Sequence, residues 1–184
     1  MRRILLVAVA GLYLLVGPAL AAAADVGDAS ESSESSPTQP EPPAAVSLAA
    51  QDASVFVPAG WVQVPPQAGA TVVLRAAGDV DAQIEVRTSG SVGPPRQPNY
   101  FSTFHSNIKQ AGFEQTARRE GACGPHDGTE VTYRGLIDGR SFQLVICQWT
   151  VSQRVWLVSA FYPRAAKQFY YPGFKSLLQK SRFD

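Results

Sequence analysis

Residues 129–162, TEVTYRGLIDGRSFQLVICQWTVSQRVWLVSAFY, carry the main signal of the fold. Its β-branched and aromatic residues divide at Asp138-Gly139 and near residues 151–153 into three runs, 129–137, 140–150 and 154–162. An Asp-Gly pair between two apolar runs is the signal of a two-residue type I′ hairpin. The stretch therefore predicts three consecutive antiparallel strands in a meander.

The second and third of these strands are apolar on both faces, because both alternating sets of side chains in residues 142–149 and 155–162 are dominated by apolar types. A sheet with two apolar faces needs a cover on each side. One helix is predicted over residues 99–111, between Asn99 as a cap and Gly112 as a stop. Its apolar face carries Phe101, Phe104, His105 and Ile108 at helical spacing. A second helix is predicted from Ala165 onward, with a break at Pro172-Gly173. The expected fold is α+β, an antiparallel sheet with helices on both faces.

Further short strands are expected upstream, at residues 54–57, 61–64, 71–75 and 82–87, and one at 113–119 after the first helix. In residues 82–87 apolar and polar residues alternate, which predicts a strand that is buried on one face only. We expect a single globular domain over residues 51–184.

The N-terminus has the pattern of an export signal. Arg2-Arg3 precede an apolar run over residues 4–16, Gly17-Pro18 interrupt it, and alanine-rich small-x-small sites follow up to Ala24. We therefore expect residues 1–24 to be a signal peptide, with a retained membrane anchor as the alternative. Cleavage leaves no stable anchor and places the protein in the periplasm or outside the cell. Residues 25–50 are rich in Ser, Glu and Pro and lack aromatic residues, which predicts a disordered linker.

The signal peptide, the linker and the domain differ in their charge. Of sixteen Lys and Arg residues, two lie in the signal; of fifteen Asp and Glu residues, five lie in residues 25–50, which carry no base. The domain of residues 51–184 keeps fourteen bases against ten acids. This mild excess and the isolated Arg118-Arg119 pair lack the dense basic stripe of a nucleic-acid-binding protein.

Cys123 and Cys147 are the two cysteines of the chain. An even count in an exported protein predicts a disulfide. The alternative is a zinc site that combines the cysteines with His126 and Asp127, since Cys-x-x-His is a permissible ligand spacing. We expect the disulfide and no metal or other cofactor.

At the level of the whole domain, the sequence resembles the PsbP/Mog-like fold family, which includes exported bacterial proteins of the LpqN/LpqT type. The resemblance rests on the opening phrase at residues 56–61, which ends in Gly60-Trp61, on the middle helix followed by Gly112-Phe113, and on the closing segment of residues 174–183. It implies an α/β/α sandwich that works by binding. No partner-specific residues of the family are matched here.

No constellation in the sequence indicates catalysis. A Gly-x-Ser-x-Gly elbow is missing, and His105 lies on the apolar face of its predicted helix, where a core or core-edge histidine is expected. We therefore expect a non-catalytic accessory or protein-binding domain whose partner the sequence does not name. A module that binds a small molecule or lipid, and a small secreted hydrolase, are the alternatives. The candidate partner surface comprises Tyr170, Tyr171, Arg134 and Arg140, because Tyr170 and Tyr171 cannot both point inward from a regular helix.

Overall fold

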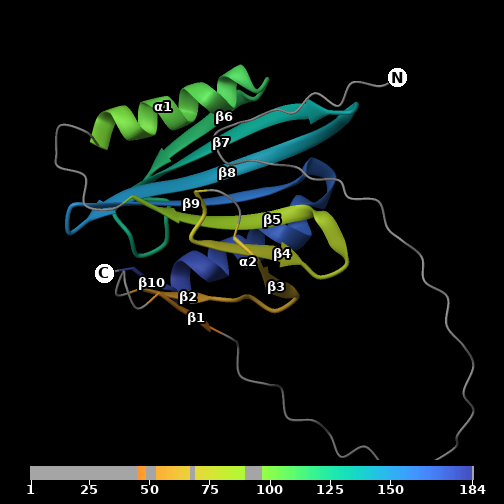
Figure 1. The fold of residues 1–184 in the computed structure, drawn as a ribbon. Helices are drawn as coiled ribbons and strands as arrows, with labels where there is room; N and C mark the ends of the chain where they lie inside the picture. Colours follow the sequence, from red (N-terminus) through yellow and green to blue (C-terminus); the bar gives the residue numbers. More distant parts are fainter. Residues whose placement is uncertain (1–44, 49–52, 67–68, 90–96, 184) are drawn as a thin grey trace, which may run out of the picture.

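The computed structural model describes residues 45–48, 53–66, 69–89 and 97–183 (Figure 1). The predicted signal peptide and residues 25–44 of the predicted linker lie outside the described residues. The elements are β1 (Ala45–Leu48), β2 (Ala53–Phe56), β3 (Trp61–Val64), β4 (Val72–Ala76), β5 (Asp79–Thr88), α1 (Gln97–Gln110), β6 (Glu114–Glu120), β7 (Gly128–Ile137), β8 (Arg140–Val151), β9 (Arg154–Pro163), a 3₁₀ turn η3 (Arg164–Ala166), α2 (Lys167–Lys180) and β10 (Arg182–Phe183).

In the described part of the chain, seven strands form one antiparallel sheet in the order β3-β4-β5-β9-β8-β7-β6. The predicted meander is confirmed as β7, β8 and β9. Ile137 pairs with Arg140, and Asp138 and Gly139 between them have φ of 49° and 77°. A type I′ turn requires positive φ at both central residues, which is why the Asp-Gly pair fixes this hairpin.

A second antiparallel sheet has the order β1-β2-β10. It brings the two ends of the described chain together, because β2 pairs with β1 on one side and with β10 on the other. β1 falls inside residues 25–50, which the composition predicts as linker. Its sequence, AVSL, lacks the Glu and Pro of the preceding residues and pairs along its length with β2. The fold therefore begins before Gln51.

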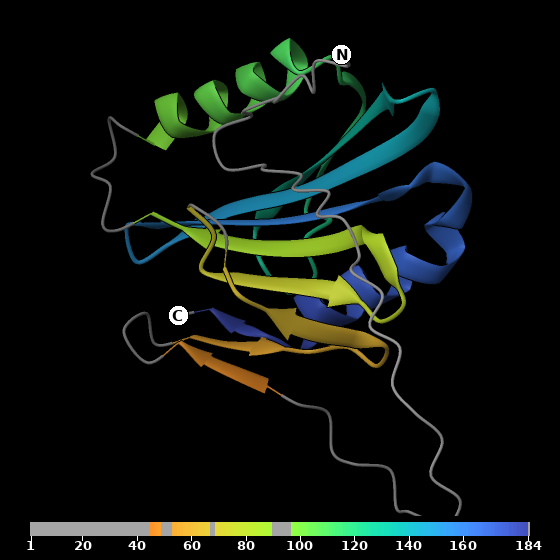
Figure 2. The same ribbon diagram turned by 45° about the vertical axis from the view of Figure 1, so that its right-hand side comes forward.

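The large sheet is covered on both faces (Figures 1 and 2). On one face, Ile108 of α1 packs in a cluster with Leu144, Ile146 and Leu157. On the other, α2 joins a cluster with the opposite side chains of β8 and β9, to which the small sheet also contributes. The mixed α+β class is confirmed, but the second face is covered by a helix together with a sheet rather than by helices alone. None of the helices within residues 97–183 is long and apolar enough to cross a bilayer.

The boundaries of both helices differ from their predictions. α1 begins at Gln97, so Asn99 lies inside the helix and is not its cap. Gly112, with φ of 86°, lies two residues after Gln110, the last residue of α1, and terminates the helix as predicted. α2 runs through Pro172 without a break. Pro172 and Gln168 are both exposed, so water can satisfy the Gln168 carbonyl that lacks its usual N–H donor.

β5 is buried on both faces rather than on one. Glu85 and Arg87, predicted to face solvent, are 3% and 5% exposed. They neutralise each other, because Arg87 donates to Glu85 Oε2 from Nε at 2.9 Å and from an amino nitrogen at 2.5 Å. The alternation of the sequence located the strand correctly but did not reveal that its polar face is covered.

Candidate functional site

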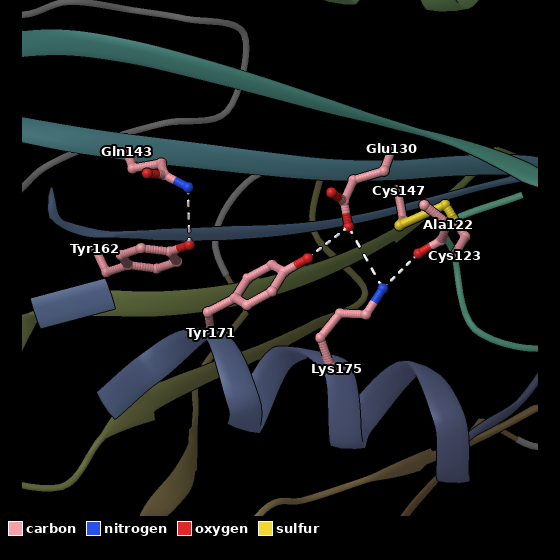
Figure 3. Close-up of polar contacts among 8 residues, drawn as sticks. All are labelled: Ala122, Cys123, Glu130, Gln143, Cys147, Tyr162, Tyr171 and Lys175. Atoms are coloured by element: carbon pink, nitrogen blue, oxygen red, sulfur yellow. Dashed lines mark hydrogen bonds and ion pairs between the residues drawn. A yellow bond between two sulfur atoms is a disulfide. The ribbon is translucent and has the colours of Figure 1, made fainter. Parts of the chain in front are cut away.

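A buried carboxylate organises the face of the sheet beneath α2 (Figure 3). Glu130 of β7 is 2% exposed and points toward α2. Tyr171 and Lys175 lie four residues apart on α2, one helical turn, and therefore reach the same point. The Tyr171 hydroxyl donates to Glu130 Oε2 at 3.0 Å, and Lys175 Nζ lies 3.5 Å from the same oxygen.

Burial and the Glu130 charge keep the tyrosines of this face protonated. Burial, followed by the Glu130 charge and the hydrogen bond to it, raises the pKa of Tyr171 to about 12. Burial also raises the pKa of Tyr162 strongly, with Tyr171 and Glu130 adding to the effect. Both phenols are therefore protonated at neutral pH and are not nucleophiles or bases.

A row of polar residues crosses three strands next to this cluster. Arg134 of β7 is opposite Gln143 of β8, which is opposite Tyr162 of β9. Gln143 Nε2 donates to the Tyr162 hydroxyl oxygen at 3.2 Å, and both residues are buried (Figure 3). Arg134, closer to the sheet edge, is exposed. The row thus runs from the core to the surface.

The two cysteines lie beside this cluster. The Cα atoms of Cys123 and Cys147 are 5.5 Å apart, and the structure joins them as a disulfide. Cys147 pairs in register with Glu130, and Lys175 Nζ donates to the Ala122 carbonyl next to Cys123 (Figure 3). One lysine of α2 therefore contacts both the buried carboxylate and the loop that the disulfide attaches to the sheet.

The rest of this loop packs by aromatic contact. The His126 ring stacks on Trp149 with centroids 4.5 Å apart and planes at 5°. Burial lowers the pKa of His126, so its neutral form is favoured. Within the described residues, no three His, Cys, Asp or Glu side chains gather as a metal site requires.

On the opposite face, His105 belongs to a hydrogen-bonded chain. Its Nε2 lies 2.6 Å from Gln148 Oε1, and the Tyr133 hydroxyl lies 2.6 Å from its Nδ1. Burial lowers the pKa of His105. A neutral ring that donates from Nε2 and accepts at Nδ1 satisfies both neighbours. His105 is half-buried, as expected of a histidine at the edge of the core.

One end of the large sheet presents exposed apolar side chains. In the described part of the chain, four large apolar residues are exposed: Val62, Val80, Leu136 and Phe169. Three of these lie where β5 begins, where β7 ends and where α2 begins. These positions are at the same end of the sheet, because the end of β9, which leads through η3 into α2, lies beside the start of β8 and the start of β5, and the start of β8 lies beside the end of β7. We call Val80, Leu136 and Phe169 the apolar end.

The four candidate surface residues, Tyr170, Tyr171, Arg134 and Arg140, differ in how they lie relative to the apolar end. Tyr170 packs edge-on against Trp61 and donates to Asp79. Arg140 pairs with Asp81 at 2.7 Å and contacts the Phe142 ring.

These two residues lie near the apolar end, as does Arg134, which is two residues from Leu136. Arg134 faces the α2 side of the sheet and Arg140 the α1 side, so they do not form one patch. Tyr171 points away from this end, toward Glu130.

Of the three consecutive aromatic residues 169–171, Phe169 is exposed, whereas Tyr170 and Tyr171 are half-buried, on different sides of α2. Sequence reasoning missed Glu130 and Lys175. Glu130 gave no signal, because an acid in an alternating strand reads as solvent-facing. The spacing of Tyr171 and Lys175 indicated a shared helix face but not what lies opposite that face.

Comparison with known proteins identifies the fold. No protein-family model matches the sequence, and no curated protein matches it. Among solved structures, cyanobacterial PsbP from Synechocystis sp. PCC 6803 matches with a TM-score of 0.55 at 13% identity, over 83% of this chain and 98% of its own.

The Ran-binding protein Mog1p of Saccharomyces cerevisiae matches with a TM-score of 0.52 at 10% identity, over 77% of this chain and 95% of its own. LpqN, involved in cell envelope biogenesis of Mycobacterium tuberculosis, matches with a TM-score of 0.50 at 11% identity, over 77% and 85%. The chain has the PsbP/Mog-like fold, and likeness at this level of identity shows the fold alone.

Proposed function

We propose that this protein is an exported, non-catalytic accessory domain that binds a protein partner through the apolar end of its sheet. The observation that carries the proposal is that Val80, Leu136 and Phe169, with exposed fractions of 73%, 73% and 69%, all lie at the same end of the sheet, on β5, β7 and α2. Single exposed apolar residues are ordinary, whereas several together are typical of interaction sites.

The surroundings of the apolar end favour a protein partner. Tyr170 is held by Trp61 and Asp79, so it loses little conformational freedom when a partner covers it. Arg134 and Arg140 add cations on the two faces of the same end. Tyr and Arg beside large apolar residues are the types that dominate binding energy at protein interfaces.

The arrangement of layers supports the same surface. With α1 over one face of the large sheet and α2 together with the small sheet over the other, a partner would meet the sheet at its end, where Val80 and Leu136 are exposed. The Ran-binding protein Mog1p, which shares the fold, is itself a binding protein by its name. A binding role for the present chain agrees with that likeness.

Two features support a non-catalytic role. The polar groups beneath α2 bind one another: Glu130 accepts from Tyr171 and pairs with Lys175. The neighbouring phenols have raised pKa values, which makes them poor bases or nucleophiles near neutral pH. Such a network holds α2 on the sheet.

Export is supported by the sequence pattern of residues 1–24 and by the Cys123–Cys147 pair. Disulfides persist in the periplasm and outside the cell and are rare in the cytosol.

A photo-crosslinking experiment tests the proposed surface. The full chain is expressed in its native host with p-benzoylphenylalanine at Phe169, and, as a matched control, at Ser102 on the exposed side of α1. We expect a discrete adduct from position 169 that is absent from position 102 and that Leu136→Asp abolishes. Equal adducts from both positions, or none from 169, contradict the proposed surface.

A further inference from the structure

The flank of the molecule between α2 and the strands β7 and β6 is positively charged. Lys167 and Lys175 place Nζ 5.3 Å and 5.9 Å from the centre of the Tyr171 ring, which lies between them. Across from α2, Arg119 of β6 pairs in register with Glu130, and Arg134 lies four residues further along β7. We call Arg119, Arg134, Lys167 and Lys175 the basic flank.

The acids on this flank do not neutralise it. Glu130 is buried and already bound by Lys175 and Tyr171. Glu114 is exposed and stands opposite Arg134 in the strand pairing. Among the described residues, the ion pairs involve Arg87, Arg118, Arg140 and Lys175. Arg119, Arg134 and Lys167 are therefore exposed cations with no ion-pair partner in the described part of the chain. The exposed acid that faces them on this flank is Glu114, so positive charge is in excess.

The buried pair fixes part of this flank in place. A carboxylate that is removed from water is costly unless it is paired and hydrogen-bonded. Glu130 meets that condition by binding Tyr171, whose ring contacts both lysines. The two lysines, about two turns apart on α2, therefore both lie against a ring whose hydroxyl Glu130 holds in place.

We propose that the basic flank binds an extended acidic segment of the partner protein, so this inference rests on the proposed function. The flank follows β7 from Glu130 to Leu136, seven residues, a length of about 20 Å at the rise of a strand. A single small anion contacts only one or two of these cations, whereas an acidic segment of similar length meets all of them. The flank ends at Leu136 of the apolar end, so one partner can contact both.

A peptide-binding experiment tests the proposal. The probe is an N-acetylated, C-amidated decapeptide that alternates Glu and Ser, and the control probe replaces each Glu by Gln. Binding to the mature chain is measured by isothermal titration calorimetry at 20 mM and 150 mM salt. We expect the Glu peptide to bind and the Gln peptide not to bind. We also expect binding to weaken with salt, since the screening length shortens to about 8 Å at the higher concentration.

Variants that remove the same charge at different sites show whether the peptide binds to the basic flank or responds only to the net charge of the protein. Arg134→Gln with Lys167→Gln should weaken binding of the Glu peptide about fivefold or more, as expected when two exposed ion pairs are lost. The control, Lys109→Gln with Arg118→Gln, removes the same charge from α1 and from the other face of β6 and should leave the affinity unchanged. Equal weakening by both pairs, or no binding of the Glu peptide at low salt, overturns the proposal.

Two outcomes identify which proposal fails. If the adduct at Phe169 forms but the Glu peptide does not bind, the acidic-segment inference is wrong and the proposed function stands. If the peptide binds but no adduct forms, the proposed interface is wrong. A further variant replaces the five acids of residues 25–50 by amides. If the mature chain binds the Glu peptide only in this variant, the ligand of the basic flank is the protein's own N-terminal segment, which overturns binding to a partner.

Discussion

Removing Lys175 should destabilise the protein through Glu130. The Lys175→Met variant keeps the length and packing of the side chain but leaves the Glu130 carboxylate, 2% exposed, without its ammonium partner. Breaking a fully buried ion pair costs about 3–5 kcal/mol. The Lys175 side chain is 36% exposed and Tyr171 still donates to the carboxylate, so we expect a smaller loss of about 2 kcal/mol.

The converse change should cost less. Glu130→Gln keeps an acceptor for Tyr171, and the freed Lys175 can turn to water while it still reaches the Ala122 carbonyl. We expect a loss of about 1 kcal/mol, the usual net value of one hydrogen bond. In the double variant, Lys175→Met no longer leaves a buried carboxylate without a cation, because Glu130→Gln has already removed the charge. The loss in free energy of unfolding should therefore be smaller than the sum of the two single losses by about 1 kcal/mol.

Urea unfolding followed by tryptophan fluorescence measures all three free energies. Lys167→Met is the matched control: Lys167 also lies over the Tyr171 ring but is exposed and has no ion-pair partner in the described part of the chain. It should change the free energy of unfolding by less than about 0.5 kcal/mol. Single losses that add within about 0.5 kcal/mol refute the coupling of Glu130 to Lys175.

Three further predictions concern the disulfide, pH and helix packing. Cys123→Ser should lower the free energy of unfolding by about 3 kcal/mol, because the bridge closes a loop with a sequence separation of 24; two reactive thiols in the denatured, unreduced wild type contradict the bridge. Burial lowers the pKa of His105 in the folded state, so below about pH 6.5, the pKa of an unperturbed histidine, the unfolded chain binds more protons than the folded one. The free energy of unfolding should therefore be highest above about pH 6.5 and fall as the pH drops toward the folded-state pKa of His105. His105→Gln should reduce this fall in urea unfolding at pH 7.5 and 5, and a fall of unchanged size assigns it elsewhere, for example to His126, whose pKa is also lowered. Gly173→Ala should cost about 1–3 kcal/mol in thermal unfolding, since a Cβ there lies 2.6 Å from Trp61 Nε1, and an unchanged melting temperature would show that Trp61 can move aside.

Local sequence was sufficient for most of the strands of the large sheet. Asp138-Gly139 fixed the hairpin between β7 and β8, because its backbone requirement is met within two residues. Gly112 ended α1 for the same kind of reason. Pro172 was misleading, because whether a proline breaks a helix depends on whether the carbonyl that loses its donor reaches solvent.

The candidate site was only partly accessible to sequence reasoning. The sequence named Arg134, Arg140 and Tyr170 as candidate surface residues because of their charged or aromatic side chains, and the structure places them near one end of the sheet. Glu130 was missed, since an acid in a strand is expected to face water. Phe169, more exposed than either neighbouring tyrosine, was also missed, since side-chain direction on a helix is set by what the helix packs against.

Residue types and spacing alone predicted the order and type of the strands of the large sheet and of the two helices, the apolar character of both faces of β8 and β9, the α+β class, and the pattern of an export signal. These follow from residue types and spacing within ten or so positions. Three features became evident only from tertiary packing: β1 and β10 join β2, Glu85 pairs with Arg87 in the interior, and Glu130 meets Tyr171 and Lys175. Each of these depends on which element covers which face. For β10 with β2, and for Glu130 with Tyr171 and Lys175, that choice is made by packing between residues more than 40 positions apart. For β1 with β2 the partners are 5 to 11 positions apart, but the composition of residues 25–50 predicted linker there. For Glu85 and Arg87 the choice depends on the exclusion of water from β5.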